Sequence, residues 1–200
     1  MTNPKFQDAY YLLEISRIEL EDLIKNELQE NPALELEDSA AAEKSPSEKK
    51  QTARSLVPDV RIHQNGNQFV VVLSDEGLRL RINPLYDRMA AQKIRIEGRV
   101  DYPFFIEKAR AAKWFIKAIE QRQSTILRVS EGIFRFQREL LQRGLNHIHP
   151  MSLRELADHI RLPESVIIRA AANKWVETPH ALFALDWFFA QPNTAKSSRG

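Results

Sequence analysis

The sequence contains no cysteine and only six glycines in 200 residues. Without cysteine the chain can form no disulfide, no thiolate metal site and no cysteine nucleophile, which suits a reducing compartment such as the cytoplasm. Six glycines leave little room for a glycine-rich phosphate loop, and neither a nucleophile elbow nor an HExxH element occurs. We therefore expect a protein that is not an enzyme and that has no catalytic residue and no cofactor.

Long apolar runs are also lacking. No stretch approaches the ~20 apolar residues of a membrane helix, and the N-terminus has no basic segment followed by an apolar one. His147 and His149 stand two residues apart without a third ligand at metal-binding spacing. The sequence predicts a cytoplasmic protein with no membrane segment and no metal site.

Charge is distributed unevenly along the chain. The total is +2, but residues 1–55 carry 12 acids and 7 bases, a net −5, which leaves +7 for residues 56–200. An acidic arm thus precedes a basic body that could meet nucleic acid or an acidic protein surface.

The longest helix-compatible run is Phe104–Arg128. An apolar stripe at the helical period predicts that one face packs on a core, while the other face is strongly basic. That basic face is either simply solvated or suited to an acidic partner. A bend at 123–125 is expected, because Ser124 or Thr125 could cap a second helix that ends at Gly144. The two helices would form an antiparallel pair, with close packing at Gly132.

The arm preceding this run is predicted to hold two helices. The first begins at Asn3 and Pro4, and the second begins at Ser16, where Glu19 completes a capping-box spacing, and ends at Asn31 and Pro32. The arm binds either a partner or the rest of the chain, because two short helices bury little against each other.

A linker without large apolar residues follows at 39–55. Alternating residues in 60–73 predict a β-hairpin with a two-residue type I′ turn at Asn65-Gly66, and 80–82 could add a third strand. A short helix opens at Asn83-Pro84, and 93–102 is expected to be a loop.

Residues 152–175 have helix-turn-helix spacing. Ser152 and Glu155 predict a capped first helix, Arg161–Pro163 the turn, and Val166–Ala172 the second helix. A structural helical hairpin without a nucleic-acid role remains the alternative.

Four stretches resemble the sigma-54 (RpoN-type) sigma factors of bacterial RNA polymerase. Tyr11–Glu35, which includes Glu-Asn-Pro, is similar to the family's activator-responsive region, and Pro58–Pro84 to the opening of its core-binding region. Ala112–Arg128, with its Ala-Lys-Trp and Ile-Glu-Gln-Arg series, is the most specific piece. The fourth stretch comprises the following pieces: Asn173-Lys174-Trp175, Thr178-Pro179, Phe183 and Phe188-Phe189.

The resemblance implies a non-catalytic initiation factor that binds core RNA polymerase and promoter DNA. It would help hold a closed complex until a bacterial enhancer-binding AAA+ activator ATPase remodels it. The implied activator-contacting and inhibitory surface consists of Leu12, Leu13, Ile15, Ile18, Leu20, Leu23 and Ile24. The implied polymerase-binding residues are Lys108, Lys113, Trp114, Lys117, Glu120, Gln121, Arg122 and Arg128. The implied DNA-binding residues are Arg169, Asn173 and Lys174.

Two departures from the family pattern affect DNA binding. The chain stops at Gly200, before the expected C-terminal RpoN-box domain, so promoter affinity is expected to be weak. Val166 and Ile168 stand where the family has Thr and Ser in a Ser-Thr-x-Ser-Arg run, and their side chains cannot donate hydrogen bonds to phosphates or bases.

The expected fold is mainly α: a helical core-binding region with a short β-hairpin, followed by a helix-turn-helix, after a flexible helical N-terminal arm. The predicted domains are an activator-interacting region (1–38), a flexible linker (39–55), a core-polymerase-binding region (56–150), a helix-turn-helix region (151–190) and a disordered tail (191–200). Two alternatives stay open: a diverged interaction protein that binds polymerase or activator without promoter recognition, and a free-standing helix-turn-helix repressor.

Overall fold

The computed structural model describes residues 9–37, 57–66, 68–74, 79–91 and 102–190. The predicted cap at Asn3, the linker at 39–55, nearly all of the loop at 93–102 and the tail at 191–200 lie outside these residues. The rest is mainly helical with short strands, so the predicted fold class is confirmed.

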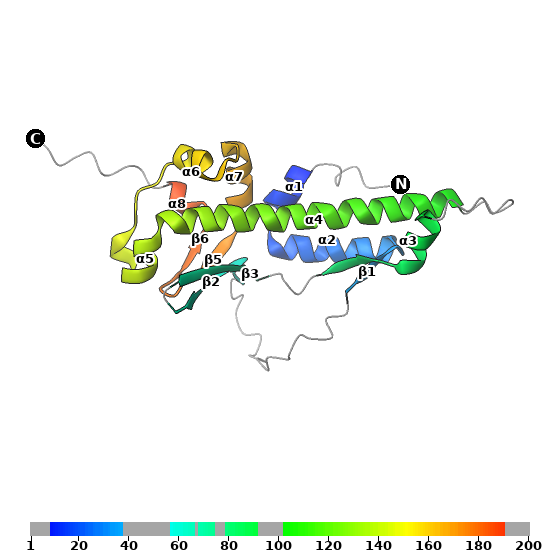
Figure 1. Ribbon diagram of the computed structural model, residues 1–200, viewed down its shortest axis with the longest axis horizontal. Coiled ribbons are helices and arrows are strands. Elements are labelled where there is room, and N and C mark those ends of the chain that lie inside the picture. The colour runs from blue at the N-terminus through cyan, green and yellow to red at the C-terminus, as the bar shows by residue number, and fades with distance from the viewer. Residues whose placement is uncertain (1–8, 38–56, 67, 75–78, 92–101, 191–200) are drawn as a thin grey trace, which may run out of the picture.

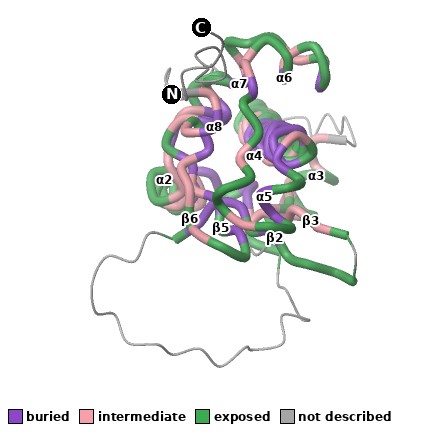
Figure 2. The backbone as a smooth tube through the Cα atoms, turned by 90° about the vertical axis from the view of Figure 1, so that its left-hand side faces the viewer, coloured by how far each residue is buried: buried purple, intermediate pink, exposed green. Residues whose placement is uncertain are grey.

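One long helix, α4 (Tyr102–Phe136), runs the length of the molecule (Figure 1). Its 35 residues correspond to about 52 Å. The helices α1 (Ala9–Glu14), α6 (Leu153–Ile160) and α7 (Glu164–Ala171) lie along one side of α4, and α2 (Arg17–Glu30) and the strands lie along the other. Figure 2 shows that buried residues gather along this helix.

The predicted bend at 123–125 is wrong, because α4 is continuous there. Thr125 does not cap a new helix: its hydroxyl donates to the carbonyl of Gln121, one turn earlier, at 2.7 Å. Ser130 donates to Ile126 in the same way, at 2.8 Å. Because both hydroxyls bond within the helix, nothing competes with the helical backbone. The expected antiparallel pair is therefore a single helix, followed after Gln137 by the short α5 (Arg138–Arg143) and a 3₁₀ turn (Leu145–His147).

Two hydrophobic cores form along α4. The first packs the N-terminal half of α4 against α1, α2, β1 (Leu34–Leu36) and β4 (Leu80–Ile82), next to α3 (Pro84–Ala91). The second packs the C-terminal half against β2 (Val60–Asn65), β3 (Gln68–Leu73) and the elements after residue 150. Leu12 belongs to the first core and Leu13 to the second, so α1 joins the two.

Strands tie distant parts of the chain together. The hairpin β2–β3 is confirmed, but its register pairs Asn65 with Gln68, so the turn lies one residue later than predicted. β4 pairs with β1, which the sequence analysis did not identify. β2 also pairs in parallel with β5 (Trp175–Glu177), which pairs with β6 (Leu182–Ala184) just before α8 (Trp187–Ala190). The segment 57–83 thus contributes strands to both cores.

Close helix packing is present at Gly132, as predicted, but the helix that packs there against α4 is α6. A Cβ at this position would lie 2.5 Å from Cγ2 of Ile160 and 2.8 Å from Cδ1 of Leu156. Both neighbours are buried and belong to the same core. A side chain at residue 132 would therefore have to push α6 away from α4.

We predict that Gly132→Ala lowers the free energy of unfolding by about 1–3 kcal/mol, because overpacking outweighs the ~1 kcal/mol that alanine gains in a helix. Urea denaturation measures the change. Ser124→Ala, at an exposed position of the same helix, is the matched control and should change stability by less than about 0.5 kcal/mol. A stabilised Gly132→Ala protein would contradict the close packing.

Candidate functional site

The two helices α6 and α7 are joined by a tight turn. The Ser152 hydroxyl accepts the Glu155 backbone N–H at 3.2 Å, and the Glu155 carboxylate accepts the Ser152 backbone N–H at 2.8 Å. The Ser152 backbone N–H and the Ser152 hydroxyl, which donates to the same carboxylate at 2.7 Å, lower the pKa of Glu155, and the capping box fixes the start of α6. Arg161 ends α6 in the left-handed conformation, with φ 53°. The predicted helix, turn and second helix are all present.

All three predicted DNA-binding residues contact α1 or the residue after it. The Arg169 guanidinium lies 2.8 Å from the Glu14 carboxylate and 5.3 Å from the centre of the Tyr10 ring. The Asn173 side chain donates to the Glu14 carbonyl at 3.4 Å. The N-terminal region therefore engages all three side chains, but it buries only Lys174 and leaves Arg169 partly exposed and Asn173 exposed.

Lys174 is buried, with 1% of its surface exposed. Its ammonium donates to the carbonyls of Leu13, Glu14 and Ile15 at 3.1, 3.3 and 2.8 Å, and to its neighbour Ala172 at 2.8 Å. Burial, followed by the nearby charge of Arg122, lowers the pKa of Lys174 to about 8. In this conformation Lys174 caps the end of α1 and is not accessible to DNA, so its DNA-binding role stays a prediction.

Arg122 caps the same helix end from α4. Its guanidinium donates to the carbonyl of Leu12 at 2.7 Å and to that of Leu13 at 3.4 Å, and only 2% of the residue is exposed. The sequence analysis placed Arg122 on the basic solvent face, which is wrong. The charge is buried because the last carbonyls of α1 have no partner within the helix and need donors.

The predicted activator-contacting residues mostly face inward. Ile18 is the exception, with 73% of its surface exposed. The others are buried or, in the case of Leu23, partly buried: Leu12, Leu13, Ile15, Leu20, Leu23 and Ile24. Of the two interpretations left open for the arm, the structure shows packing against the rest of the chain. An activator role for this surface stays a prediction.

Some of the predicted polymerase-binding side chains already bond to other elements of this chain, and the others are exposed. Besides Arg122, Lys108 caps α2 by donating to the Glu30 carbonyl at 2.9 Å, and Arg128 donates to the Ile160 carbonyl at the end of α6. Lys113 forms a 2.8 Å ion pair with Asp87. The remaining members of the set are exposed on α4: Trp114, Lys117, Glu120 and Gln121.

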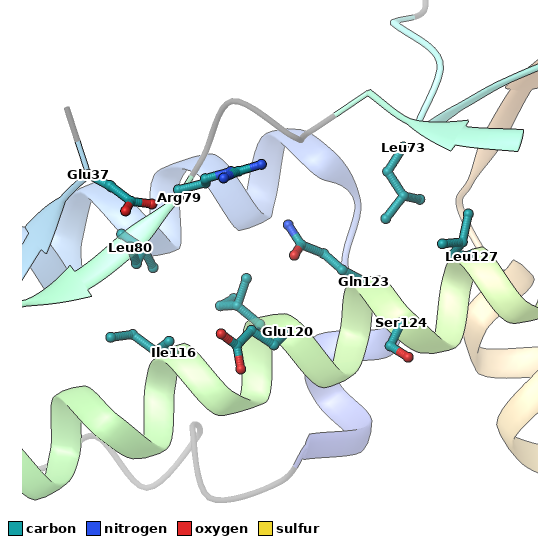
Figure 3. Close-up of a pocket in the computed structure, with 10 residues that line it drawn as sticks. Glu37, Leu73, Arg79, Leu80, Ile116, Glu120, Gln123, Ser124 and Leu127 are labelled. Atoms are coloured by element: carbon teal, nitrogen blue, oxygen red, sulfur yellow. The ribbon is translucent and has the colours of Figure 1, made fainter. Parts of the chain in front are cut away.

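A groove of about 570 Å³ lies between α4 and the strands β3 and β4. Figure 3 shows Glu120, Gln123 and Leu127 of α4 on one side and Leu73, Arg79 and Leu80 on the other. Both polar and apolar side chains line it. Only Glu120 of the predicted polymerase-binding set lies in this groove.

Two structural findings bear on cations and membranes. Within the described ranges, no three histidines or carboxylates come together in a way that could hold a metal ion. No helix in those ranges is long and apolar enough to cross a membrane.

Two family models match the chain on either side of the hairpin. The sigma-54 activator-interacting domain matches residues 3–36, and the sigma-54 DNA-binding domain matches residues 103–199. The chain belongs to the sigma-54 family. The helix α1 that covers α7 thus lies in the activator-interacting match, and α7 lies in the DNA-binding match.

Curated sigma-54 factors resemble this chain over about two thirds of its length. The RNA polymerase sigma-54 factor of Pseudomonas aeruginosa is 32% identical over 139 residues, which are 69% of this chain and 27% of that protein. The corresponding factor of Azotobacter vinelandii is 33% identical, over 68% of this chain and 26% of that protein. The chain therefore spans about a quarter of the length of these relatives.

A solved structure shares the fold. It is described as Aquifex aeolicus sigmaN bound to promoter DNA, and it matches with a TM-score of 0.51 and 23% identity. The match covers 72% of this chain and 42% of that one. The DNA-binding sigma-54 model begins at residue 103, within the range 56–150 that the sequence analysis assigned to polymerase binding. That assignment stays a prediction.

Sequence reasoning missed several residues that hold this sigma-54 chain together. Asn31, 1% exposed, donates to the Lys108 carbonyl at 3.2 Å and accepts the Ala33 N–H at 3.1 Å, which explains its place after α2. Asp59 accepts the Trp175 N–H at 2.9 Å beside the parallel pairing of β2 and β5. No local pattern marks the contacts with Lys108 and Trp175, because these partners lie 77 and 116 residues away from Asn31 and Asp59.

We predict a pH-dependent contribution of Lys174 to stability. Between about pH 8 and 10.4, the folded protein has lost this proton while an unfolded lysine still holds it. Stability rises with pH where the unfolded state binds more protons. The free energy of unfolding of the wild type, measured relative to Lys174→Met, should therefore increase across this window, by on the order of 1–3 kcal/mol.

Denaturant unfolding at several pH values measures this difference. Lys25→Met removes an exposed lysine from α2 and should give no comparable pH dependence. If the wild type instead loses stability relative to Lys174→Met between about pH 8 and 10.4, the pKa prediction is wrong. The hydrogen bonds from the ammonium to the carbonyls would then stabilise the charged lysine by more than burial destabilises it.

Proposed function

We propose that this chain acts as a sigma-54-type initiation factor, or as part of one. It binds core RNA polymerase, contacts promoter DNA and helps hold a closed complex until a bacterial AAA+ activator ATPase remodels its N-terminal region. Its role is non-catalytic, because it works by binding and by the rearrangement of α1. The family membership supports this proposal.

The observation that carries the proposal is the cover that α1 forms over α7. The Glu14 carboxylate forms a 2.8 Å ion pair with the Arg169 guanidinium, and the carbonyls of Leu13 to Ile15 accept hydrogen bonds from the Lys174 ammonium. A DNA phosphate could reach the buried Lys174 only after α1 has left, whereas the partly exposed Arg169 would have to exchange Glu14 for the phosphate. The covered state therefore corresponds to the closed complex, and the uncovered state to the one that proceeds to melting.

Remodelling by an activator has a defined cost in this geometry. Moving α1 takes the carbonyls of Leu12 and Leu13 from the buried Arg122 and those of Leu13 and Glu14 from the buried Lys174, and weakening the pairing of a buried charge costs several kcal/mol. Thermal motion seldom supplies that energy, whereas ATP hydrolysis does. The exposed Ile18, between α1 and the body of α2, offers an apolar contact that can be reached while α1 is still packed.

Polymerase docking uses the exposed part of α4. Trp114, 38% exposed, and Lys117 lie on the surface of the helix, and neither caps another element. An aromatic ring beside a cation is typical of residues that anchor an interface.

A second candidate function has one observation in its favour. Ile168, on α7, is 54% exposed, so part of the surface of the second helix is apolar where a DNA-reading helix has donors. A protein that binds polymerase or activator without recognising promoters would have such a face. Footprinting with polymerase on sigma-54-type promoters separates the two functions, because only the initiation factor protects them.

We predict that the full chain co-purifies with core RNA polymerase at low salt. Trp114→Ala combined with Lys117→Glu should weaken the complex at least about tenfold, or ~1.4 kcal/mol, because it removes the anchor and reverses a charge. Lys25→Glu, an equal charge reversal on α2, is the control and should retain wild-type affinity. Absence of a complex with the wild-type chain would exclude the polymerase-binding role.

A further inference from the structure

An arginine-rich cavity lies between α4 and the turn after α6. We call it the arginine notch. It has a volume of about 230 Å³, several times the ~30 Å³ of a water molecule. Arg128, Glu131 and Arg135 of α4 line it together with His159, Ile160 and Arg161.

Local structure directs the arginines toward one space. Arg128 and Arg135 are seven residues apart, so they lie on the same face of α4 about two turns from each other. Gly132 lies between them and brings the end of α6 against α4. Arg161 reaches the notch from the turn, where its backbone is held in the left-handed conformation by the N–H donated to Ala157.

The charges of the notch are not neutralised from within. Among the described residues, no ion pair joins Arg128, Arg135 or Arg161 to a carboxylate, although Glu131 is close by. Arg128 is oriented by donating to the Ile160 carbonyl, so it is preorganised. Three guanidinium groups with one carboxylate leave a net positive cavity, which favours a group with several anionic oxygens.

We propose that the arginine notch binds a backbone phosphate of nucleic acid, through Arg135 and Arg161 with Arg128 in support. The inference rests on the DNA-binding part of the proposed function and adds a contact site to it. All the residues of the notch lie within the match to the sigma-54 DNA-binding domain. Arginine is suited to phosphate because its planar donors can form two parallel hydrogen bonds.

The notch is separate from the surface that α1 covers. Arg161 precedes α7, whereas Asn173 and Lys174, which hold α1, follow its end. The eight residues of α7 put about 12 Å between these two ends. Phosphate binding at the notch therefore does not require α1 to move, and the covered protein can still contact DNA.

The test uses the full chain and a short duplex DNA of mixed sequence. Each phosphate contact contributes about 0.9 to the slope of log affinity against log salt concentration. Removing the contacts by Arg135→Gln with Arg161→Gly should reduce the slope by about 0.9 to 1.8 and weaken binding over about 50–200 mM salt. Glycine accepts the left-handed backbone at 161, so this variant keeps the turn.

Arg110→Gln is the matched control, because it removes one exposed arginine from the far half of α4. Arg110→Gln should leave the salt slope unchanged. If lysine replaces glycine at position 161 of the double variant, giving Arg135→Gln with Arg161→Lys, part of the lost slope should return. Equal slopes for the wild type and the double variant would overturn the inference, as would a wild-type chain that binds no duplex at low salt. If Arg110→Gln reduced the salt slope as much as the double variant does, the inference would also be overturned, because the loss would then reflect the total charge of the chain and not the notch.

Polymerase binding by the same variants distinguishes this inference from the proposed function. If the double variant binds DNA normally but loses core polymerase, the notch docks an acidic protein surface and the phosphate proposal is wrong. If the wild type fails to bind polymerase while the double variant still loses salt-dependent DNA binding, the notch proposal stands and the initiation role fails.

Discussion

The arrangement of this protein depends on cations that reach the C-terminal carbonyls of two N-terminal helices. Arg122 and Lys174 bond to the carbonyls at the end of α1, and Lys108 bonds to Glu30 at the end of α2. A helix end that is buried needs donors for its last four carbonyls, and no local glycine cap is present here. The cations come from α4 and from the residues after α7, so the caps also fix where α1 lies relative to both.

This constraint explains why so much of the basic charge serves the fold. Lys108 and Arg122 belong to a helix whose sequence reads as apolar on one side and basic on the other. The basic side does not all face solvent, because α1 and α2 present carbonyl oxygens to it. The exposed residues near Lys117 and the arginine notch belong to the positive surface that is left for partners.

Most helices and strands could be predicted from the sequence, but few of the contacts between them could. Capping boxes at Ser16 and Ser152 and the hairpin at 60–73 follow from short-range rules, and the structure has them. The bend at Thr125 failed because a hydroxyl can cap a new helix or bond back within the old one, and spacing does not distinguish the two. The roles of Arg122 and Lys174 could not be predicted, since a periodic pattern shows which face a residue occupies but not which oxygen approaches it.

The capping side chains lie far along the chain from the carbonyls that they bond, and this separation matters during biosynthesis. Lys174 follows its acceptor Leu13 by 161 residues, and β5 follows its partner β2 by more than a hundred. At about 5–20 residues per second, α1 leaves the ribosome roughly 8–30 s before its lysine cap exists. Until Lys174 is made, the terminal carbonyls of α1 can bond to water, to other proteins or, once α4 has emerged, to Arg122. The helix α1 is therefore made well before the residues that complete its packing.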